Sequence, residues 1–352
     1  MDNATLSVGN GDLEFMPTSF GTVFTVTNNS AFSISRDMRL FGLSNTLHFA
    51  GNSLPALFNG QFLITGHGNH VIVENTELEC SLNVNIFYGA TDGGVSGHIF
   101  EVKRGGTFIT KDRFQMYGNG DLTEVDGGKL FITGEYGLVF WDRAANAPAT
   151  TTNTLRVANG GLFQNKFGWG IRPTTGCVLI EADGVDPETG EPSLCEPVFG
   201  NADLPYPGFT LRAACGGVLS LTNNANTAIL MMNASGALDG PKTVLNTAGG
   251  EIRCGALQVN GANNGLAPVV TAAHGTGKVV VKGTATFGAN TWVWPTAEKG
   301  AAAKEYIILE AGTLIGAPLL APDVDTSVWR LRDENNKLYL RYSRGGTLFM
   351  LK

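Results

Sequence analysis

One recurring unit dominates the sequence: an alternating apolar–polar run reaches a Gly-Gly pair, and a second alternating run leaves it. The clearest copy is Phe100–Thr110, and Glu124–Thr133 and Leu155–Asn165 repeat it. Leu211–Thr222 and Val244–Cys254 are further copies. Glycine supplies the backbone freedom that a tight turn needs, and alternation with period two indicates a short strand on either side. The chain is therefore expected to stack copies of one structural unit.

The spacing of the glycine pairs selects among all-β architectures. Gly105, Gly127 and Gly160 follow one another at intervals of 22 and 33 residues, and Gly216 and Gly249 are also 33 residues apart. This period fits one coil of a parallel β-helix, whereas a β-sandwich shows hairpin signals every ~8–12 residues and a propeller blade takes ~40–45 residues. We predict an all-β chain that folds as a single-stranded right-handed parallel β-helix of about eight or nine coils.

The chain divides into a long solenoid and a shorter end segment. We assign residues 1–295 to the parallel β-helix and residues 296–352 to a C-terminal capping β segment, because an uncovered solenoid end offers unpaired strand edges. The interval from Gly161 to Gly216 breaks the period, and its excess lies in Ala182–Phe209, which carries five prolines. We expect residues 182–209 to form a loop excursion from the solenoid wall, where solenoids commonly bind partners.

Composition and charge narrow the function classes. The chain has 24 basic and 31 acidic residues and no basic stripe, so a nucleic-acid partner is not expected. No apolar run reaches the ~18 residues of a membrane helix, so no transmembrane segment is expected. A charged fraction of only 16%, with abundant glycine, threonine and asparagine, is typical of exported proteins. We therefore expect the protein to be secreted or held at the cell surface.

The five cysteines form no Cys-x-x-Cys pair, so a zinc cluster is not expected. Cys177 and Cys195 flank an acidic segment that contains prolines, and they are our disulfide candidate, because a bridge would stabilise a loop that buries no core of its own. The alternative interpretation is that they are small buried hydrophobic residues.

Acidic residues before one glycine turn form the first candidate site. Asp121, Glu124 and Asp126 cluster there, and strand alternation places Glu124 and Asp126 on one face. Such carboxylates can bind calcium or act on a sugar. The alternative is that they are solvated outward positions beside a turn.

The loop excursion supplies the second candidate site. Asp183, Asp186 and Glu188 could hold calcium, although they lack the regular spacing of an EF-hand loop. Tyr206 stands between two prolines, is expected to be exposed, and could contact a sugar. Apart from possible calcium, no cofactor is expected.

Catalytic residues stay unknown at this level. Gly66-His67-Gly68 resembles the Gly-His-Gly element of polygalacturonases, but that family's other sequence elements are absent. Serine-nucleophile and zinc-protease motifs are absent as well. The sequence therefore favours a protein that is not an enzyme.

The glycine-turn coils, followed by Tyr306–Gly316 and Trp329–Tyr342, resemble bacterial autotransporter-type passenger domains, and most nearly proteins with autotransporter-associated β-strand repeats. The resemblance implies a right-handed parallel β-helix, secretion and adhesion. The expected function is a non-enzymatic, adhesin-like or structural module whose partner is a glycan or a surface protein of a host or neighbouring cell. Two alternatives remain: a carbohydrate-active enzyme (polysaccharide lyase or glycoside hydrolase), and a filament subunit that self-associates through its solenoid ends.

Overall fold

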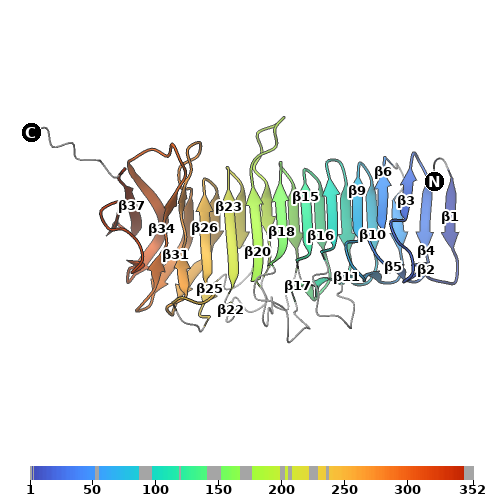
Figure 1. Cartoon of the computed structure of the whole chain (residues 1–352), viewed down its shortest axis with the longest axis horizontal. Coiled ribbons are helices and arrows are strands. Elements are labelled where there is room, and N and C mark those ends of the chain that lie inside the picture. The colour runs from blue at the N-terminus through green and yellow to red at the C-terminus, as the bar shows by residue number, and fades with distance from the viewer. Residues whose placement is uncertain are drawn as a thin grey trace, which may run out of the picture.

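The computed structural model describes residues 2, 4–51, 55–86, 97–118, 120–140, 152–166, 177–198, 203–204, 208–221, 229–234 and 238–344. Their strands stack along one axis into an elongated solenoid, with β1 (Thr5–Val8) at one end and β37 (Lys337–Tyr342) at the other (Figure 1). Nearly all strand pairings are parallel, so the predicted parallel β-helix is confirmed. These described residues contain no helix, and hence none that is long and apolar enough to cross a membrane.

Sheet A forms one wall of the solenoid and contains one strand from each coil. Its twelve strands are β3 (Val23–Thr27), β6 (Thr46–Ala50), β9 (His70–Glu74), β12 (Ile99–Lys103), β15 (Leu122–Asp126), β18 (Thr152–Ala158), β20 (Cys177–Asp183), β23 (Phe209–Ala214), β26 (Thr243–Ala248), β29 (Asn264–Leu266), β32 (Trp292–Val293) and β35 (Leu319–Leu320). The solenoid therefore has more coils than expected, because several coils turn without a Gly-Gly pair.

Sheets B and C form the other walls. Sheet B contains β1 (Thr5–Val8), β4 (Ala31–Ile34), β7 (Ala56–Phe58), β10 (Glu77–Cys80), β13 (Thr107–Thr110), β16 (Lys129–Ile132), β19 (Leu162–Asn165), β21 (Leu194–Glu196), β22 (Asp203–Leu204), β24 (Val218–Leu221), β25 (Ile229–Met232), β27 (Glu251–Cys254), β28 (Ala256–Val259), β31 (Lys278–Phe287), β34 (Glu305–Ile315), β36 (Trp329–Glu334) and β37 (Lys337–Tyr342). Sheet C contains β2 (Leu13–Phe15), β5 (Met38–Leu40), β8 (Phe62–Ile64), β11 (Val84–Ile86), β14 (Arg113–Met116) and β17 (Gly137–Phe140), and β30 (Val269–Val270) pairs with β33 (Thr296–Ala297).

The core is built from ladders of inward side chains, each residue lying against its equivalent one coil away. The longest ladder follows sheet A through Phe24, Leu47, Val71, Phe100, Thr123, Leu155, Ile180, Leu211, Leu245, Leu266, Val293 and Leu320. Its one polar member, Thr123, is buried and lies 3.6 Å from the sulfur of Met116. Because adjacent parallel strands lie ~4.8 Å apart, the apolar rungs contact one another along the whole axis.

Aromatic rings fill the core of the N-terminal coils. Phe100 packs edge-on against Phe108 and Phe114, with ring centroids 4.8 and 5.3 Å apart. The connected set is Phe15, Phe24, Phe32, Phe49, Phe58, Phe62, Phe100, Phe108 and Phe114. Each such pair stabilises a core by about 0.5–1.5 kcal/mol beyond the burial of its area.

The Gly-Gly pair connects a strand of sheet A to a strand of sheet B. Between β12 and β13, Gly105 has φ +72°, in the left-handed region. A Cβ on Gly106 would lie 2.3 Å from the carbonyl oxygen of Val73 in the preceding coil. The first glycine is therefore needed for its conformation and the second for its lack of a side chain.

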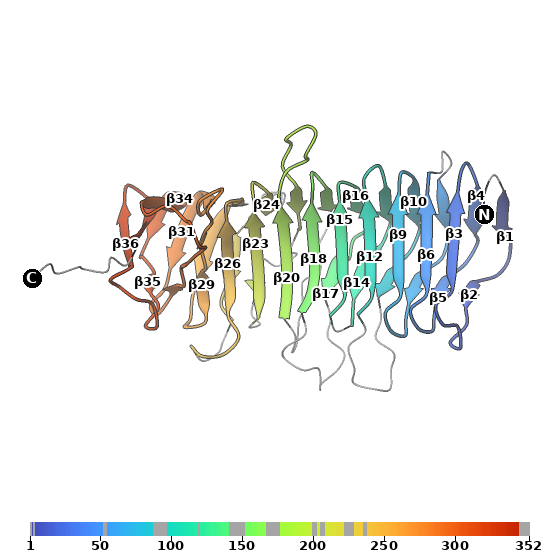
Figure 2. The same ribbon diagram turned by 45° about the horizontal axis from the view of Figure 1, so that its top comes forward.

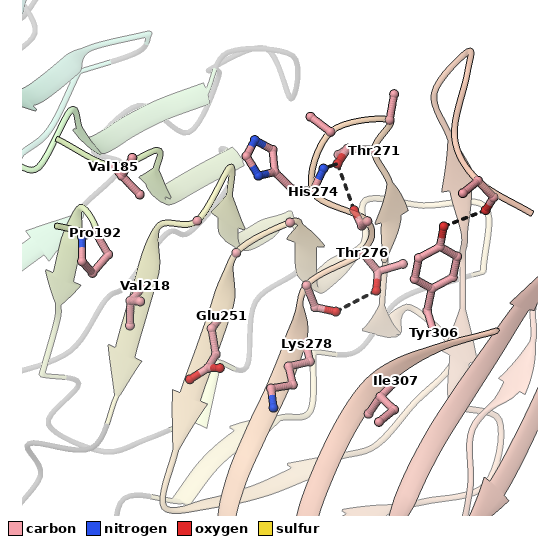
Figure 3. A pocket seen from close by; sticks show the side chains of 18 of the residues that line it. Val185, Pro192, Val218, Glu251, Thr271, His274, Thr276, Lys278, Tyr306 and Ile307 are labelled. Atoms are coloured by element: carbon pink, nitrogen blue, oxygen red, sulfur yellow. Dashed lines mark hydrogen bonds between the residues drawn. The ribbon is translucent and has the colours of Figure 1, made fainter. Parts of the chain in front are cut away.

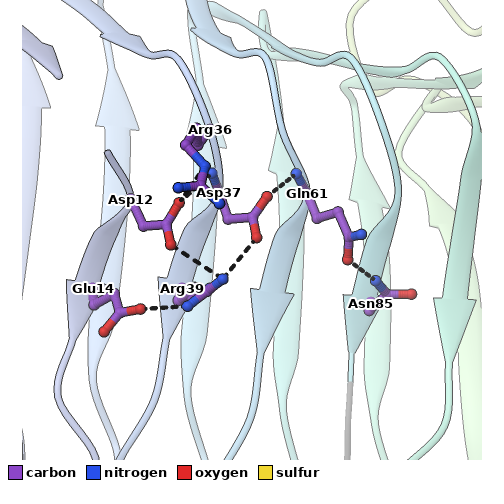
Figure 4. Close-up of polar contacts among 7 residues, drawn as sticks. All are labelled: Asp12, Glu14, Arg36, Asp37, Arg39, Gln61 and Asn85. Atoms are coloured by element: carbon purple, nitrogen blue, oxygen red, sulfur yellow. Dashed lines mark hydrogen bonds and ion pairs between the residues drawn. The ribbon is translucent and has the colours of Figure 1, made fainter. Parts of the chain in front are cut away.

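Arg39 links the outer face of sheet C across the first two coils (Figure 4). Its guanidinium lies 3.1 Å from Asp12, 2.6 Å from Glu14 and 2.9 Å from Asp37. The hydrogen bonds to Asp37 and Glu14 raise the pKa of Arg39. Asp37 also accepts the backbone N–H of Gln61 at 2.9 Å, which extends the contacts into the third coil.

The loop excursion is smaller than the predicted 182–209. Ala182 and Asp183 belong to β20, and β21 and β22 belong to sheet B. The protruding part is closed by an antiparallel bridge between Val185 and Pro192 and rises above the corner near β20 and β24 (Figure 2). The long interval between glycine pairs therefore contains one complete additional coil, whose turn is the excursion.

The solenoid continues past residue 295, because the parallel strands of sheet A run to β35. The antiparallel cap is formed by β36 and β37, with β37 also pairing antiparallel with β34. Trp329 stacks on Tyr342 with ring centroids 4.7 Å apart. The antiparallel cap thus begins later than the predicted boundary at residue 296, and residues 345–352 of the predicted segment lie outside the described residues.

Candidate functional site

An open groove of about 740 Å³ lies over the corner between sheets A and B in the C-terminal half (Figure 3). Its floor is made of turn glycines from successive coils: Gly216, Gly249, Gly250 and Gly277. Val185 and Pro192 of the excursion form one wall. The turn at residues 271–275 and the ring of Tyr306 form the second wall. The groove is therefore enclosed by two segments, the excursion and this turn, that lengthen their coils beyond the repeated unit.

Glycine is required where the second wall closes over the floor. Gly249 has φ +88°, and a Cβ there would lie 2.3 Å from the Cβ of His274. A Cβ on Gly275 would lie 3.1 Å from the ring of Tyr306. The glycines therefore allow an imidazole and a phenol ring to approach the corner closely.

Thr271 holds the turn that carries His274. Its N–H and its hydroxyl both donate to the carbonyl of Gly275, at 2.9 and 3.0 Å, and its hydroxyl accepts the N–H of His274 at 3.0 Å. Thr271 is buried, whereas the His274 side chain is exposed. The turn thus presents the imidazole at the groove edge from a fixed backbone.

The charged side chains that line the groove are three cations, Arg253, Lys278 and Lys304, and one carboxylate, Glu251. Arg253 lies 2.5 Å from Glu251, so these two charges offset each other. Lys304 is exposed, lies 5.0 Å from the ring centroid of Tyr306, and has no ion pair among the described residues. Tyr306 donates its hydroxyl to the carbonyl of Ala302 at 2.6 Å, and burial raises its pKa.

Lys278 has its carboxylate partner outside the groove lining. Its ammonium contacts Glu310, which also accepts from Lys337 at 2.7 Å. The hydrogen bonds from these two lysines hold the pKa of Glu310 below its usual value. The groove lining therefore carries an excess of positive charge in a chain whose net charge is −7.

The strands that run from the groove floor are paired with one another, because β27 lies between β24 and β31 in sheet B. Gly216 N–H donates to the carbonyl of Gly249 at 2.9 Å, and Glu251 N–H donates to Gly217 at 2.9 Å. Lys278 N–H donates to Gly250 at 3.1 Å. These strands therefore offer no free edge to a bound chain.

Asp121 is a structural residue and is not exposed beside the turn. Its Oδ1 accepts the N–H of His98 at 2.9 Å, and the side chain is buried. It is one rung of a ladder in which a side chain accepts a backbone N–H from the preceding coil, through Asn45, Asn69, His98, Asp121 and Asn153. These contacts satisfy buried N–H groups at the corner before sheet A.

Glu124 and Asp126 lie on the outer face of β15, as strand alternation predicts. Glu124 accepts from Arg156 at 3.0 Å, and Asp126 accepts from Asn159 at 2.6 Å. Burial raises the pKa of Glu124. Arg156 also lies 3.6 Å from Glu181, so one guanidinium serves several carboxylates along this wall.

The proposed calcium ligands do not converge. Asp183 accepts from Arg156 at 2.5 Å on the outer face of sheet A. Asp186 accepts the N–H groups of Glu188 and Thr189 at 2.7 and 3.0 Å, which lower its pKa, and lies 3.1 Å from Arg104. Among the residues that the structure describes, no group of three His, Cys, Asp or Glu side chains could hold a metal ion. Tyr206 lies outside the described residues.

The predicted Cys177–Cys195 bridge is wrong, because Cys195 is a free thiol. It faces the core from β21, where it pairs with Phe163 of one neighbouring coil and Leu219 of the other, and it is completely buried. Burial raises the pKa of Cys195 well above its usual value. Cys195 is therefore one of the small buried hydrophobic residues of the core.

Sequence reasoning missed the groove residues His274, Lys304 and Tyr306. The available signal was the short interruption Ala272–Gly275, which precedes the alternating run of β31 and places a second addition on the same corner as the excursion. Neither the excursion nor the turn at residues 271–275 predicts a groove by itself, because the groove lies between these two segments.

The fold and this site together define a parallel β-solenoid with a cationic groove on one corner. Comparison with protein-family models, curated proteins and solved structures finds no match to this chain. The relationship to autotransporter passenger domains therefore stays a prediction.

Proposed function

We propose that the protein is a secreted or surface-exposed, non-enzymatic binding module of adhesin-like type, and that its groove holds a glycan or surface protein of a partner. The observation that carries the proposal is the groove itself: a concave, glycine-floored site walled by two additions to an otherwise plain coil. Loops added to a solenoid are where such folds commonly place binding sites, and a concave site with a few convergent polar groups suits a ligand.

The state of the carboxylates supports binding without catalysis. Glycoside hydrolysis needs one carboxylic acid and one carboxylate facing the same bond across ~5–9.5 Å. On the outer wall, Glu124 and Asp183 are both bound by Arg156, and Glu181 is bound by Arg212 at 3.0 Å. These carboxylates are engaged in ion pairs along the wall.

The proposal is tested by blocking the groove. Ala273 is exposed and lines the groove, whereas Ala303 is exposed and lies outside the lining. A glycan and surface-protein array first identifies a ligand. Ala273→Trp should then weaken its binding at least about tenfold, which corresponds to about 1.4 kcal/mol. Ala303→Trp should leave binding unchanged, and both variants should melt within error of the parent.

Two results would contradict the proposal: no ligand on either array, or equal binding by the two tryptophan variants. Sustained elongation in concentration-dependent light scattering would instead favour a filament subunit.

A carbohydrate-active enzyme, lyase or hydrolase, is the second candidate function. The observation in its favour is that Glu124 and Asp126 share the outer face of β15, where burial raises the pKa of Glu124, the direction of shift that a general acid requires. Incubation with acidic polysaccharides, with and without calcium, tests it. Release of reducing or unsaturated ends that is lost in Glu124→Gln would replace the binding proposal.

A further inference from the structure

We infer that the ligand of the groove is an anionic saccharide, whose acidic group is bound by Lys304 while its sugar rings lie on the glycine floor. This inference rests on the proposed function and names the chemistry of the ligand.

The charge of the lining indicates an anion. Of the four charged side chains among the described lining residues, only Glu251 is acidic, and Arg253 offsets it at 2.5 Å. Glu298, outside the lining, accepts the N–H of Ala272 at 3.1 Å, and Glu310 is held by two lysines. Lys304 therefore remains available to an incoming anion, and the exposed imidazole of His274 lies in the same lining.

The acidic balance of the whole chain adds to this argument. A net charge of −7 repels anions at long range, so a locally cationic groove on such a surface selects for an anion that fits it closely. The outer wall of sheet A shows the contrast, because there Arg156 lies within ion-pair distance of three carboxylates, Glu124, Glu181 and Asp183.

The floor indicates a saccharide in preference to a peptide. An extended peptide gains affinity by pairing its main chain with a strand edge. Here the N–H groups of Gly216, Glu251 and Lys278 already donate within the solenoid. A sugar does not need an edge, because its hydroxyls bond to side chains and its C–H faces lie on flat surfaces, here the glycine floor and the apolar wall of Val185 and Pro192.

Isothermal titration calorimetry with matched probes tests the inference. The probes are a galacturonic acid tetrasaccharide, the same tetrasaccharide fully methyl-esterified, and a heparin-derived sulfated tetrasaccharide. We expect the free acid or the sulfated probe to bind and the neutral ester to bind at least about tenfold more weakly, with affinity falling as salt rises. Binding of the sulfated probe alone identifies sulfate as the acidic group and supports the same inference.

Variants then assign the cation. Lys304→Gln should weaken the anionic probe by about ten- to a hundredfold, the range for a lost hydrogen bond to a charged group. Lys299→Gln, an exposed lysine outside the groove lining, is the matched control and should bind like the parent. Both changes are on the surface, and equal melting temperatures confirm that the fold is retained.

The outcomes separate the two proposals. Equal binding of the acid and its methyl ester, or unchanged binding by Lys304→Gln, overturns the anionic ligand and leaves the binding function in place. If none of the three probes binds and neither the glycan array nor the protein array shows a ligand, both the anionic ligand and the binding function are overturned.

Discussion

The N-terminal and C-terminal coils of the solenoid share one backbone plan but differ in what fills and decorates it. In the first coils, rings such as Phe58, Phe62 and Phe100 contact one another through the core. In the later coils, the inward positions hold smaller residues such as Ala182 and Ala213. The excursion and the groove lie on these later coils. The molecule thus concentrates aromatic packing in one half and the candidate binding site in the other.

The difference indicates how a solenoid can acquire a site without losing its fold. Each coil contacts only its neighbours, so stability is a sum of local contributions along the axis. Turns in the C-terminal half can therefore be lengthened while the aromatic coils remain unchanged.

The largest expected effect compares two rungs of the same core ladder. Phe100→Ala should lower the free energy of unfolding by about 3–5 kcal/mol, because it removes ring contacts with Phe108 and Phe114 as well as buried area. Leu211→Ala, at the equivalent position, should cost about 2–3 kcal/mol, since no ring contacts are lost. Urea unfolding measures both, and a larger loss for Leu211→Ala would contradict the comparison.

The second effect separates the groove turns from other turns. Gly249→Ala forces a left-handed φ of +88° and brings a Cβ to 2.3 Å from His274. It should cost about 2–4 kcal/mol. Gly184→Ala at φ +73° meets no atom within 4 Å and should cost about 1 kcal/mol. Thermal unfolding compares them, and equal losses would show that His274 moves away without cost.

The third effect concerns the outer wall. Arg156→Met removes the guanidinium shared by Glu124, Glu181 and Asp183 and should cost about 1–2 kcal/mol, a value reduced because Arg156 is 39% exposed. Arg332→Met on the exposed cap hairpin should have no measurable effect. Chemical unfolding measures the free energy of unfolding of both variants. If Arg156→Met were as stable as the parent protein, the stability of this wall would not depend on its ion pairs.

The smallest effect is a difference in pH dependence within the C-terminal coils. The pKa of Glu310 is lowered by its lysine partners, so its stabilisation is present above the unfolded pKa and is lost as pH falls through the folded one. Burial raises the pKa of Glu181, so the unfolding free energy should rise as pH falls from that raised pKa toward the ordinary value. Melting temperatures measured between about pH 7 and about pH 3 check both expectations. As pH falls, Glu310→Gln should lose less stability than the parent protein. Over the same range, Glu181→Gln should lack the gain in stability that Glu181 gives the parent protein.

The wall architecture was predictable from the sequence because it is local. A glycine pair between two alternating runs, as at Gly105-Gly106, fixes a turn and two strand faces from about ten residues. Parallel stacking follows from repetition of that unit. The coil count was underestimated because some coils turn at a single glycine, as after β6 at Gly51 and after β20 at Gly184, and so lack the pair.

The site was less predictable because it depends on contacts between coils. Asp121 is an acidic residue beside a turn in the sequence, yet the register buries it against His98. Glu124 was placed on the correct face, but its partner Arg156 lies one coil later. Val185 and Tyr306 are over a hundred residues apart and meet across a groove that only the stacking creates.

The in-register pairing of Val26, Phe49, Val73, Val102 and Val125 makes each coil an interchangeable spacer. Excising the chain from Val73 up to the residue before Val102 would join two equivalent positions and shorten the rod by ~4.8 Å, one strand spacing. Removing or adding whole coils in an engineered version of this protein would therefore change the distance between the groove and the N-terminal end of the solenoid in fixed steps of one strand spacing.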